Sequence, residues 1–232
     1  FGLDLTLWSL LPLFVASLSG VLISYLFFGN AALLPIQVSG SFLMRNIPFY
    51  LLLGVVGGFM SAYFTFVYEW VNRFFARFSS PYVRLLIGGA VLGLLVFLMP
   101  PLYGEGHEVI NHLKEGHPEL SLGDNIFGWD LHNPWVIILL LAGLAFSKVV
   151  ATSVTFGAGG VGGIFSPMLF MGGVMGNCFA RIINQIEWLP HKLPLANFTL
   201  IGMTALMTGV LHAPLTAIFL IAEVTGGYAL FV

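Results

Sequence analysis

The residues most able to do chemistry form a glycine-rich stretch, GAGGVGGIFSP, at positions 157–167. Its first six residues match the G-x-G-x-x-G spacing of a loop that binds a dinucleotide pyrophosphate. Such a loop follows a strand, precedes a helix and has an acidic residue about 20 positions further on. Here an apolar run precedes the glycines, and the first downstream acid, Glu187, lies beyond a second apolar run. A Walker-type phosphate loop is also excluded, because Gly162 is followed by another glycine and not by Lys.

The same stretch can instead bind a small anion through its backbone. Glycines let a ligand approach main-chain N–H groups, and Pro167 suits the first turn of a helix, where no N–H is required. The free amides of Ile164 and Phe165 would then point at one spot, at the positive end of a helix dipole. No Lys or Arg lies in the stretch, so partial charges would hold the ion weakly enough to release it. A glycine-rich contact between helices stays open as the alternative. The expected anion site is Gly162, Gly163, Ile164, Phe165, Ser166 and Pro167.

A second segment, HEVINH at residues 107–112, comes close to a metalloprotease motif but does not fit it. The motif H-E-x-x-H spaces its histidines four apart, whereas His107 and His112 are five apart. On a helix they would lie about 140° apart and could not share a metal. We therefore expect solvated loop histidines here, with no metal and no cofactor. Because no catalytic pattern occurs elsewhere either, the sequence predicts that the chain is not an enzyme.

Composition places these residues in a membrane. Of the 232 residues, 58% are hydrophobic and only 8% are charged, against about 25% charged in a soluble domain. No charge occurs between Asp4 and Arg45, or between Lys192 and Glu223. About 20 apolar residues in a helix cross the bilayer core, so we expect a multi-pass integral membrane protein, with the cell membrane as its location. No basic patch suggests nucleic acid as a partner.

The apolar segments that must position the site predict an all-α structure, since open sheet edges in lipid leave backbone groups unsatisfied. Glycine and proline interrupt the last three segments, and non-helical backbone at membrane depth occurs only within protein or beside a cavity. Pairs of glycines four apart, expected to let helices pack closely, are Gly54/Gly58, Gly89/Gly93 and Gly172/Gly176. The predicted helical segments are 5–28, 48–75, 81–99, 134–156, 163–186, 195–209 and 213–226.

The distribution of charge predicts the topology. Arg73, Arg77 and Arg84 cluster between the second and third segments, and the positive-inside rule puts that connection in the cytoplasm. Six of the ten acidic residues lie between Glu105 and Asp130. That polar stretch is expected on the opposite side of the membrane.

These motifs resemble the chloride channel and chloride–proton antiporter (CLC) family. GGIFSP at 162–167 resembles the family's G-x-F-x-P signature, and KVVATSVTFGAGGVGGIFSPMLFMGGVMG at 148–176 resembles its helix–loop–helix around the central chloride. IGMTALMTGVLHAPLTAIFLIAEVTGGY at 201–228 resembles a later segment with an A-P-L-T turn, and GEGHEVI at 104–110 resembles a glycine-rich stretch. The resemblance covers residues 1–232 as the second, C-terminal part of a CLC-like transmembrane domain.

The resemblance implies an inverted-repeat membrane fold with broken and re-entrant helices, chloride transport, and a homodimer whose subunits each have a pore. It carries the amides of Ile164 and Phe165 over as chloride ligands. The first repeat, with a serine-bearing G-S-G-I-P loop and a gating glutamate in G-x-E-G-P, would precede Phe1, and a pore tyrosine would follow Val232. We therefore expect an excerpt of a longer chain or one part of a split protein. Because the gating glutamate carries protons, the choice between channel and proton-coupled antiporter stays open.

Lys148 lies near one end of an apolar segment, where its ammonium can snorkel to the interface. The family resemblance implies instead a positive potential that attracts chloride towards the pore, and both alternatives stay open. Two other functions are alternatives to chloride transport. One is a non-conducting structural membrane fragment, and the other is an intramembrane protease, which no catalytic pattern supports.

Overall fold

The computed structural model describes residues 7–29, 44–123, 131–186 and 191–225, and all regular structure in these ranges is helical. Seven helices agree with the predicted segments to within two residues at each described end: α1 Leu7–Phe28, α2 Ile47–Phe75, α3 Pro81–Leu98, α6 Pro134–Gly157, α7 Phe165–Asn184, α8 Leu195–Leu211 and α9 Pro214–Thr225. Between α3 and α6 lie two short helices, α4 His107–Glu115 and α5 Glu119–Leu122. Single 3-10 turns occupy Met44–Asn46 and Pro100–Leu102. The expected all-α class is confirmed.

Prolines explain why several helix starts could be predicted. Pro81, Pro134 and Pro214 are the first residues of α3, α6 and α9. The first N–H groups of a helix have no intrahelical partner, so a proline loses no hydrogen bond there. At α6 the side chain of Asn133 completes the start, because its Oδ1 accepts a hydrogen bond from the backbone N–H of Trp135 at 3.0 Å.

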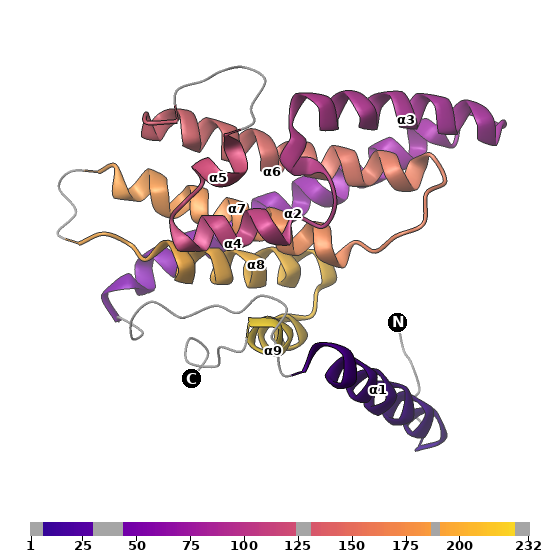
Figure 1. The fold of residues 1–232 in the computed structure, drawn as a ribbon, viewed down its shortest axis with the longest axis horizontal. Coiled ribbons are helices and arrows are strands. Elements are labelled where there is room, and N and C mark those ends of the chain that lie inside the picture. The colour runs from indigo at the N-terminus through magenta and orange to yellow at the C-terminus, as the bar shows by residue number, and fades with distance from the viewer. Residues whose placement is uncertain (1–6, 30–43, 124–130, 187–190, 226–232) are drawn as a thin grey trace.

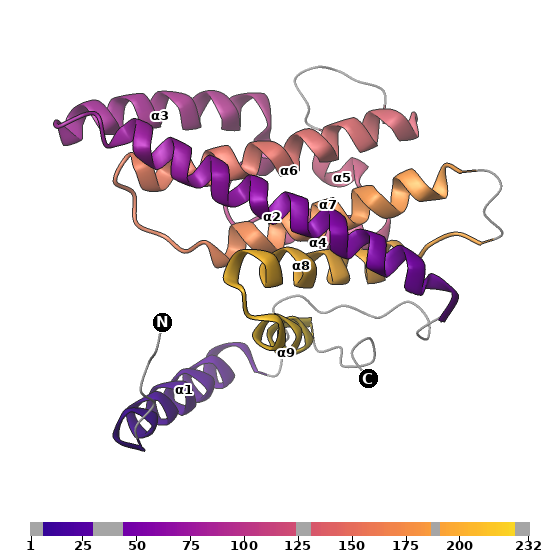
Figure 2. The ribbon, with the colours of Figure 1, turned by 180° about the vertical axis from the view of Figure 1, so that it is seen from behind.

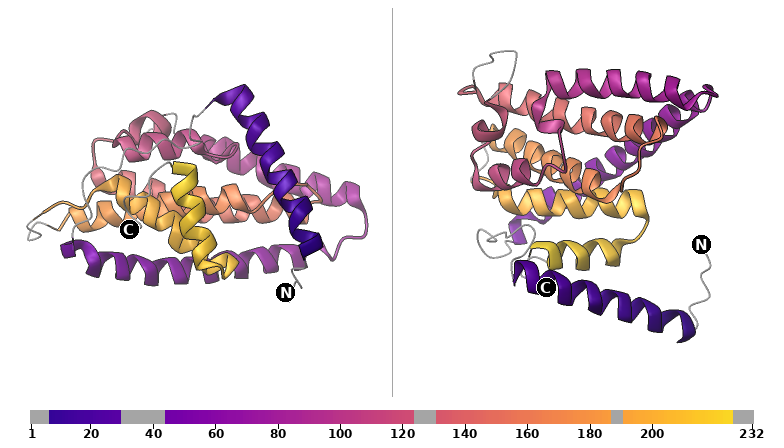
Figure 3. Two further views of the ribbon diagram at one scale, coloured as in Figure 1. Left: turned by 90° about the horizontal axis from the view of Figure 1, so that it is seen from below. Right: turned by 45° about the vertical axis from the view of Figure 1, so that its right-hand side comes forward.

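Helix α7 forms the centre of the molecule. It lies between α6 and α8, with α4 beside it (Figure 1). Helix α2 crosses the other side of the bundle and packs against α6 and α8 (Figure 2). Helix α9 packs on α8, whereas α1 stands apart from the bundle (Figure 3). The side chains of residues 11–27 in α1 are accordingly exposed.

Within the described ranges, three helical segments are long and apolar enough to cross a membrane: 44–75, 81–98 and 134–157. Helices α8 and α9 have 17 and 12 residues. At 1.5 Å per residue they measure about 26 and 18 Å, less than the ~30 Å hydrocarbon core of a bilayer. Glycine and proline therefore divide the end of the chain into short helices, as the sequence predicts.

The closest helix packing is between glycines of α7 and α8. A Cβ atom on Gly172 would lie 2.7 Å from the carbonyl oxygen of Gly202, and one on Gly176 would overlap the carbonyl of Phe198. The two backbones are in direct contact, which only glycine permits. The predicted pair Gly172/Gly176 is confirmed as a packing site.

The predicted packing at the glycine pairs on α2 and α3 is wrong, because these glycines make no close contact with another helix among the described residues. A Cβ on the neighbouring Gly57 would lie 2.8 Å from the Cβ of Ala205 on α8. The face of α2 that packs on α8 therefore contains Gly57, and not Gly54 or Gly58. The rotation of a helix is set by its whole apolar contact surface, which a four-residue spacing alone does not define. No atom would come within 4 Å of a Cβ added at Gly54, Gly58, Gly89 or Gly93.

We predict that Gly172→Ala destabilises the protein although alanine favours a helix. The added methyl must separate α7 from α8, and overpacking of this kind costs about 1–3 kcal/mol. Gly58→Ala is the matched control, since it adds the same methyl on a helix where space is open and alanine gains up to ~1 kcal/mol of helix propensity. Thermal unfolding in detergent measures both. Equal midpoints for the two variants would contradict the packing role.

The topology prediction can be tested at two exposed residues. The connection between α2 and α3 and the short helix α5 lie towards opposite ends of the bundle (Figure 1). Single cysteines at Arg77 and Glu119, with Cys178 replaced by alanine, should therefore react with an impermeant thiol reagent from opposite sides of the membrane. Reaction of both from the same side would overturn the assignment from the arginines.

Candidate anion-binding site

Helix α7 begins within the bundle and not at its end (Figure 1). After α6 the chain turns back along its last turns, and a Cβ on Gly162 would lie 3.8 Å from Cζ of Phe156. In the second turn of α7, the ring centroid of Phe170 lies 4.7 Å from Nζ of Lys148. Lys148 belongs to α6, which is long enough to cross a membrane. The start of α7 therefore lies beside the interior of a spanning helix.

The backbone at this start presents three amides without a partner. Ile164 is the N-cap residue, with φ −83° and ψ −11°, and no side chain caps the helix. The N–H of Met168 makes the first helical bond, 3.1 Å to the carbonyl of Ile164. The N–H groups of Ile164, Phe165 and Ser166 donate to no acceptor in the described part of the chain. Pro167 is the third residue of α7, where its missing N–H leaves no further donor unpaired.

The glycines of the run have two different roles. A Cβ on Gly157 would lie 2.6 Å from Cδ2 of Phe75, so this glycine permits a close contact between α6 and α2. Gly162 and Gly163 are open by comparison, and the only atom within 4 Å of a Cβ on Gly163 would be the backbone nitrogen of Phe165, at 4.0 Å. The glycine at the beginning of the run thus permits a contact between helices, whereas the glycines at its end leave the backbone accessible.

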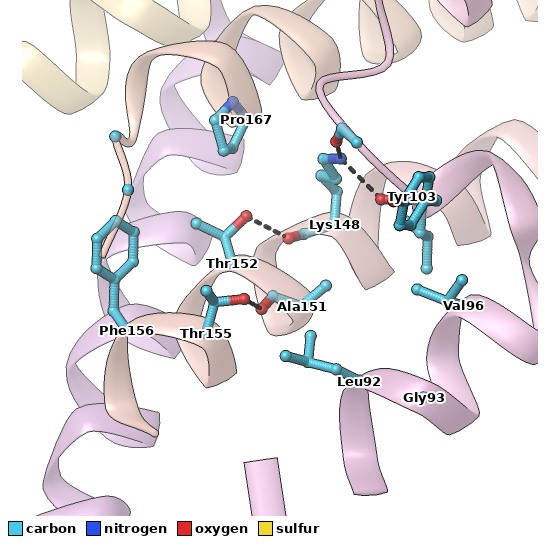
Figure 4. A pocket seen from close by; sticks show the side chains of 14 residues that line it. Leu92, Gly93, Val96, Tyr103, Lys148, Ala151, Thr152, Thr155, Phe156 and Pro167 are labelled. Carbon is cyan, nitrogen blue, oxygen red and sulfur yellow. Dashed lines mark hydrogen bonds between the residues drawn. The ribbon is translucent and has the colours of Figure 1, made fainter. Parts of the chain in front are cut away.

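A cavity of about 500 Å³ adjoins this backbone (Figure 4). Leu92 and Val96 of α3 form an apolar wall, and Gly162, Gly163 and Pro167 contribute from the other side. The threonine hydroxyls in the lining donate to carbonyls of their own helix, 2.8 Å in each case. Among the lining residues Lys148 is the only charged one. The lining of the cavity therefore has one positive and no negative side chain.

Lys148 does not snorkel, and that alternative is wrong. The residue lies nine positions before the end of α6 and its exposed fraction is only 4%. Its ammonium donates to the carbonyl oxygens of Leu102, at 3.0 Å, and Gly104, at 2.8 Å. Sequence reasoning missed these partners, because they lie 46 and 44 residues away and are backbone groups. The sequence feature that could have indicated these two carbonyls is the GEGH sequence at 104–107, because Gly104 is its first residue and Leu102 lies two positions before it.

Ser166 also points to this segment. Its hydroxyl donates to the carbonyl oxygen of Glu105 at 3.3 Å. Of the seven predicted site residues, Lys148, Gly162, Gly163 and Pro167 line the cavity, whereas Ile164, Phe165 and Ser166 form the adjoining start of α7 and are not part of that lining. The side chain of Ser166 is engaged with the protein itself, which leaves backbone amides as the donors at the start of the helix.

The predicted loop histidines are helical. Gly106 and Gly116 both have left-handed φ angles, 80° and 87°, and cap a helix between them, as glycine does where positive φ is needed. On this helix His107 pairs with Glu105 at 3.6 Å, whereas Nδ1 of His112 lies 2.7 Å from the hydroxyl of Ser121. No three His, Cys, Asp or Glu side chains in the described ranges are placed to hold a metal ion.

Comparison with known proteins assigns the family. The family model described as voltage gated chloride channel matches residues 2–232. The chain belongs to the voltage-gated chloride channel (CLC) family. Among its relatives, the voltage-gated ClC-type chloride channel ClcB of Citrobacter koseri is 30% identical over 99% of this chain and 51% of the relative. The protein of the same name from Escherichia coli O81 is 27% identical over the same shares.

CLC membership confirms the resemblance that the sequence showed and the classification as a helical integral membrane protein. The chain spans about half the length of the relatives that it matches. The CLC match includes both the glycine run and residues 102–104, so the two segments that meet at the cavity belong to the same family domain.

Bromide, a heavier analogue of chloride, tests the site directly. Crystals soaked in bromide should show anomalous density within hydrogen-bonding distance of the backbone nitrogens of both Ile164 and Phe165. The expectation follows from two unpartnered amides at the positive end of a helix. Bromide density confined to the surface of the protein would reject the site.

Proposed function

We propose that this chain is the chloride-binding second part of a CLC-type transmembrane domain, and that chloride crosses the membrane past the amides of Ile164 and Phe165. The observation that carries the proposal is the start of α7 inside the bundle, with both amides unpartnered. Family membership and the lengths of the relatives support it.

The chemistry of this site suits an ion that must also leave. Two amides and a helix dipole supply partial positive charges, whereas a direct lysine contact would bind chloride more tightly. Gly162 and Gly163 leave room for an ion to approach the main chain. Phe165 is half-buried and supplies an apolar wall. Conduction requires this combination of sufficient attraction and ready release.

The positive charge of Lys148 also favours the presence of an anion near the site. Its ammonium is buried in the wall of the cavity, and buried charges are screened by salt much less than exposed ones. We propose that it raises the electrostatic potential for anions near the site without being a ligand itself, because two of its three donors already bond to carbonyls.

Two amides do not complete the shell of a dehydrated chloride, since an unpaired charge in a low dielectric is costly. We propose that the remaining donors come from flanking segments: a serine and a gating glutamate from a first repeat, and a tyrosine from a following segment. We also propose a homodimer in the cell membrane. The exposed apolar side chains of α1 and of Leu215 and Phe219 on α9 are available for contact with lipid or with a second copy.

Chloride flux in liposomes tests the function. Residues 1–232 alone should give no chloride-selective flux, because only part of the coordination shell is present. A longer chain with the flanking segments should conduct chloride, and Gly163→Val in that chain should reduce flux to background by filling the space in front of the Phe165 amide. Chloride-selective flux from residues 1–232 alone would refute the half-site proposal.

Gly89→Val is the matched control, because it adds the same side chain at an open position on α3 outside the cavity lining. It should leave flux unchanged. A pH-sensitive dye in the same vesicles shows whether protons move against chloride, which separates a coupled antiporter from a channel. Absence of flux in the complete chain would identify a non-conducting structural protein.

A further inference from the structure

A short segment of the chain lies across the beginning of α7. Residues 102–106, which we call the strap, run from the last residue of the 3-10 turn after α3 to the residue before α4. Gly104 and Gly106 both take left-handed φ angles, 68° and 80°, so the strap bends sharply at two places. It contains the first part of the GEGHEVI sequence, to which the proposed transport function gives no role.

Lys148 fastens the strap at one end. Its ammonium donates to the carbonyls of Leu102 and Gly104 and lies over the ring of Phe170 in α7. Burying an ammonium is costly unless its donors are satisfied, so these contacts belong together. The lysine therefore joins three elements: α6, the strap and the second turn of α7.

Gly106 brings the other end of the strap into contact with α7. A Cβ atom on this residue would overlap the ring of Phe170, which is completely buried. The ring is surrounded by the core and cannot swing away freely. Any side chain at this position must lift the strap or displace the beginning of α7.

Between these two attachments, a hydrogen bond reaches the residue next to the proposed ligands. The hydroxyl of Ser166 donates to the carbonyl of Glu105 at 3.3 Å. Ser166 directly follows Phe165, so the strap is bonded to the first turn of α7 itself. The strap thus contacts α7 at Ser166 and Phe170, four residues apart and therefore on one face of the helix.

We propose that the strap fixes the position of the first turn of α7, with Lys148 and Gly106 as positioning residues for the anion-binding amides. Two amides bind one small ion only while both N–H groups point at the same place, so a displaced first turn weakens binding. The inference rests on the proposed chloride site. It differs from electrostatic attraction by Lys148, because Gly106 carries no charge.

Gly106→Ala in the full-length protein, with its flanking segments, is the first test. Isothermal titration with chloride should show an affinity about tenfold weaker than in the unsubstituted protein, equivalent to about 1.4 kcal/mol. Gly116→Ala is the matched control at the other end of α4. Its φ of 87° imposes the same backbone strain, but its Cβ would meet nothing within 4 Å, so affinity should be unchanged.

A spin label on the strap separates positioning from electrostatics. The label is attached at Tyr103→Cys, a residue with 80% of its surface exposed, in a background without other cysteines. Gly106→Ala and Lys148→Met should each increase the mobility of the label in its electron paramagnetic resonance spectrum and weaken chloride binding. Ser166→Ala removes the hydrogen bond to Glu105 without adding volume, so it should also raise label mobility and weaken chloride binding. It replaces Gly106→Ala as the test variant if Gly106→Ala does not fold.

Weaker binding in Lys148→Met alone, with label mobility unchanged in every variant, would show that the lysine acts only through its charge and would overturn the proposal. Loss of affinity in Gly116→Ala equal to that in Gly106→Ala would overturn it as well, since strain in α4 would then be the cause. If the unsubstituted protein binds no chloride, the proposed function fails, and the positioning role fails with it.

Discussion

The constraint on which this structure depends is that backbone N–H and C=O groups cannot be left unsatisfied in lipid. Helix α7 nevertheless begins inside the bundle, with the amides of Ile164 and Phe165 unpartnered. Residues 159–163 of the connection from α6 are exposed among the described residues, and a cavity adjoins them, so this backbone requires protein or water beside it at membrane depth. The same unsatisfied donors that would destabilise a lipid-facing helix are what a small anion can use. The unpaired amides are thus both the energetic cost of this helix start and the groups that could attract an anion.

Such a helix start must be held firmly, and the packing around α7 provides this. On one side, Gly172 and Gly176 bring the backbone of α7 into contact with α8 around Gly202. Farther towards the N-terminus, Phe170 is enclosed by the core and lies under Gly106 and Lys148. Small residues at one contact and a large ring at the other leave α7 little freedom to shift, since packed interiors have few voids.

Lys148 shows how a buried charge can serve structure and electrostatics together. Its ammonium donates to two carbonyls of the strap, those of Leu102 and Gly104. Hydrogen bonds to carbonyl oxygens offset the free-energy cost of burying the ammonium and leave its net charge in place. A carboxylate partner would cancel that charge. The positive potential of the cavity wall is therefore retained, and this is compatible with a neighbouring anion site.

The sequence by itself determined the membrane class, the limits of the main helices and the position of the helix start at 164–167. These follow from local properties: uninterrupted apolar runs, prolines at first turns, and glycines before α7. Only the tertiary structure decided which glycines pack, so Gly57 and Gly88 are buried while Gly54 and Gly89 are exposed. It also decided that Lys148 bonds to carbonyls more than 40 residues away and that the histidines at 107 and 112 are helical. Helix rotation and long-range contacts depend on the packing of all elements together, and no local spacing in the chain encodes that.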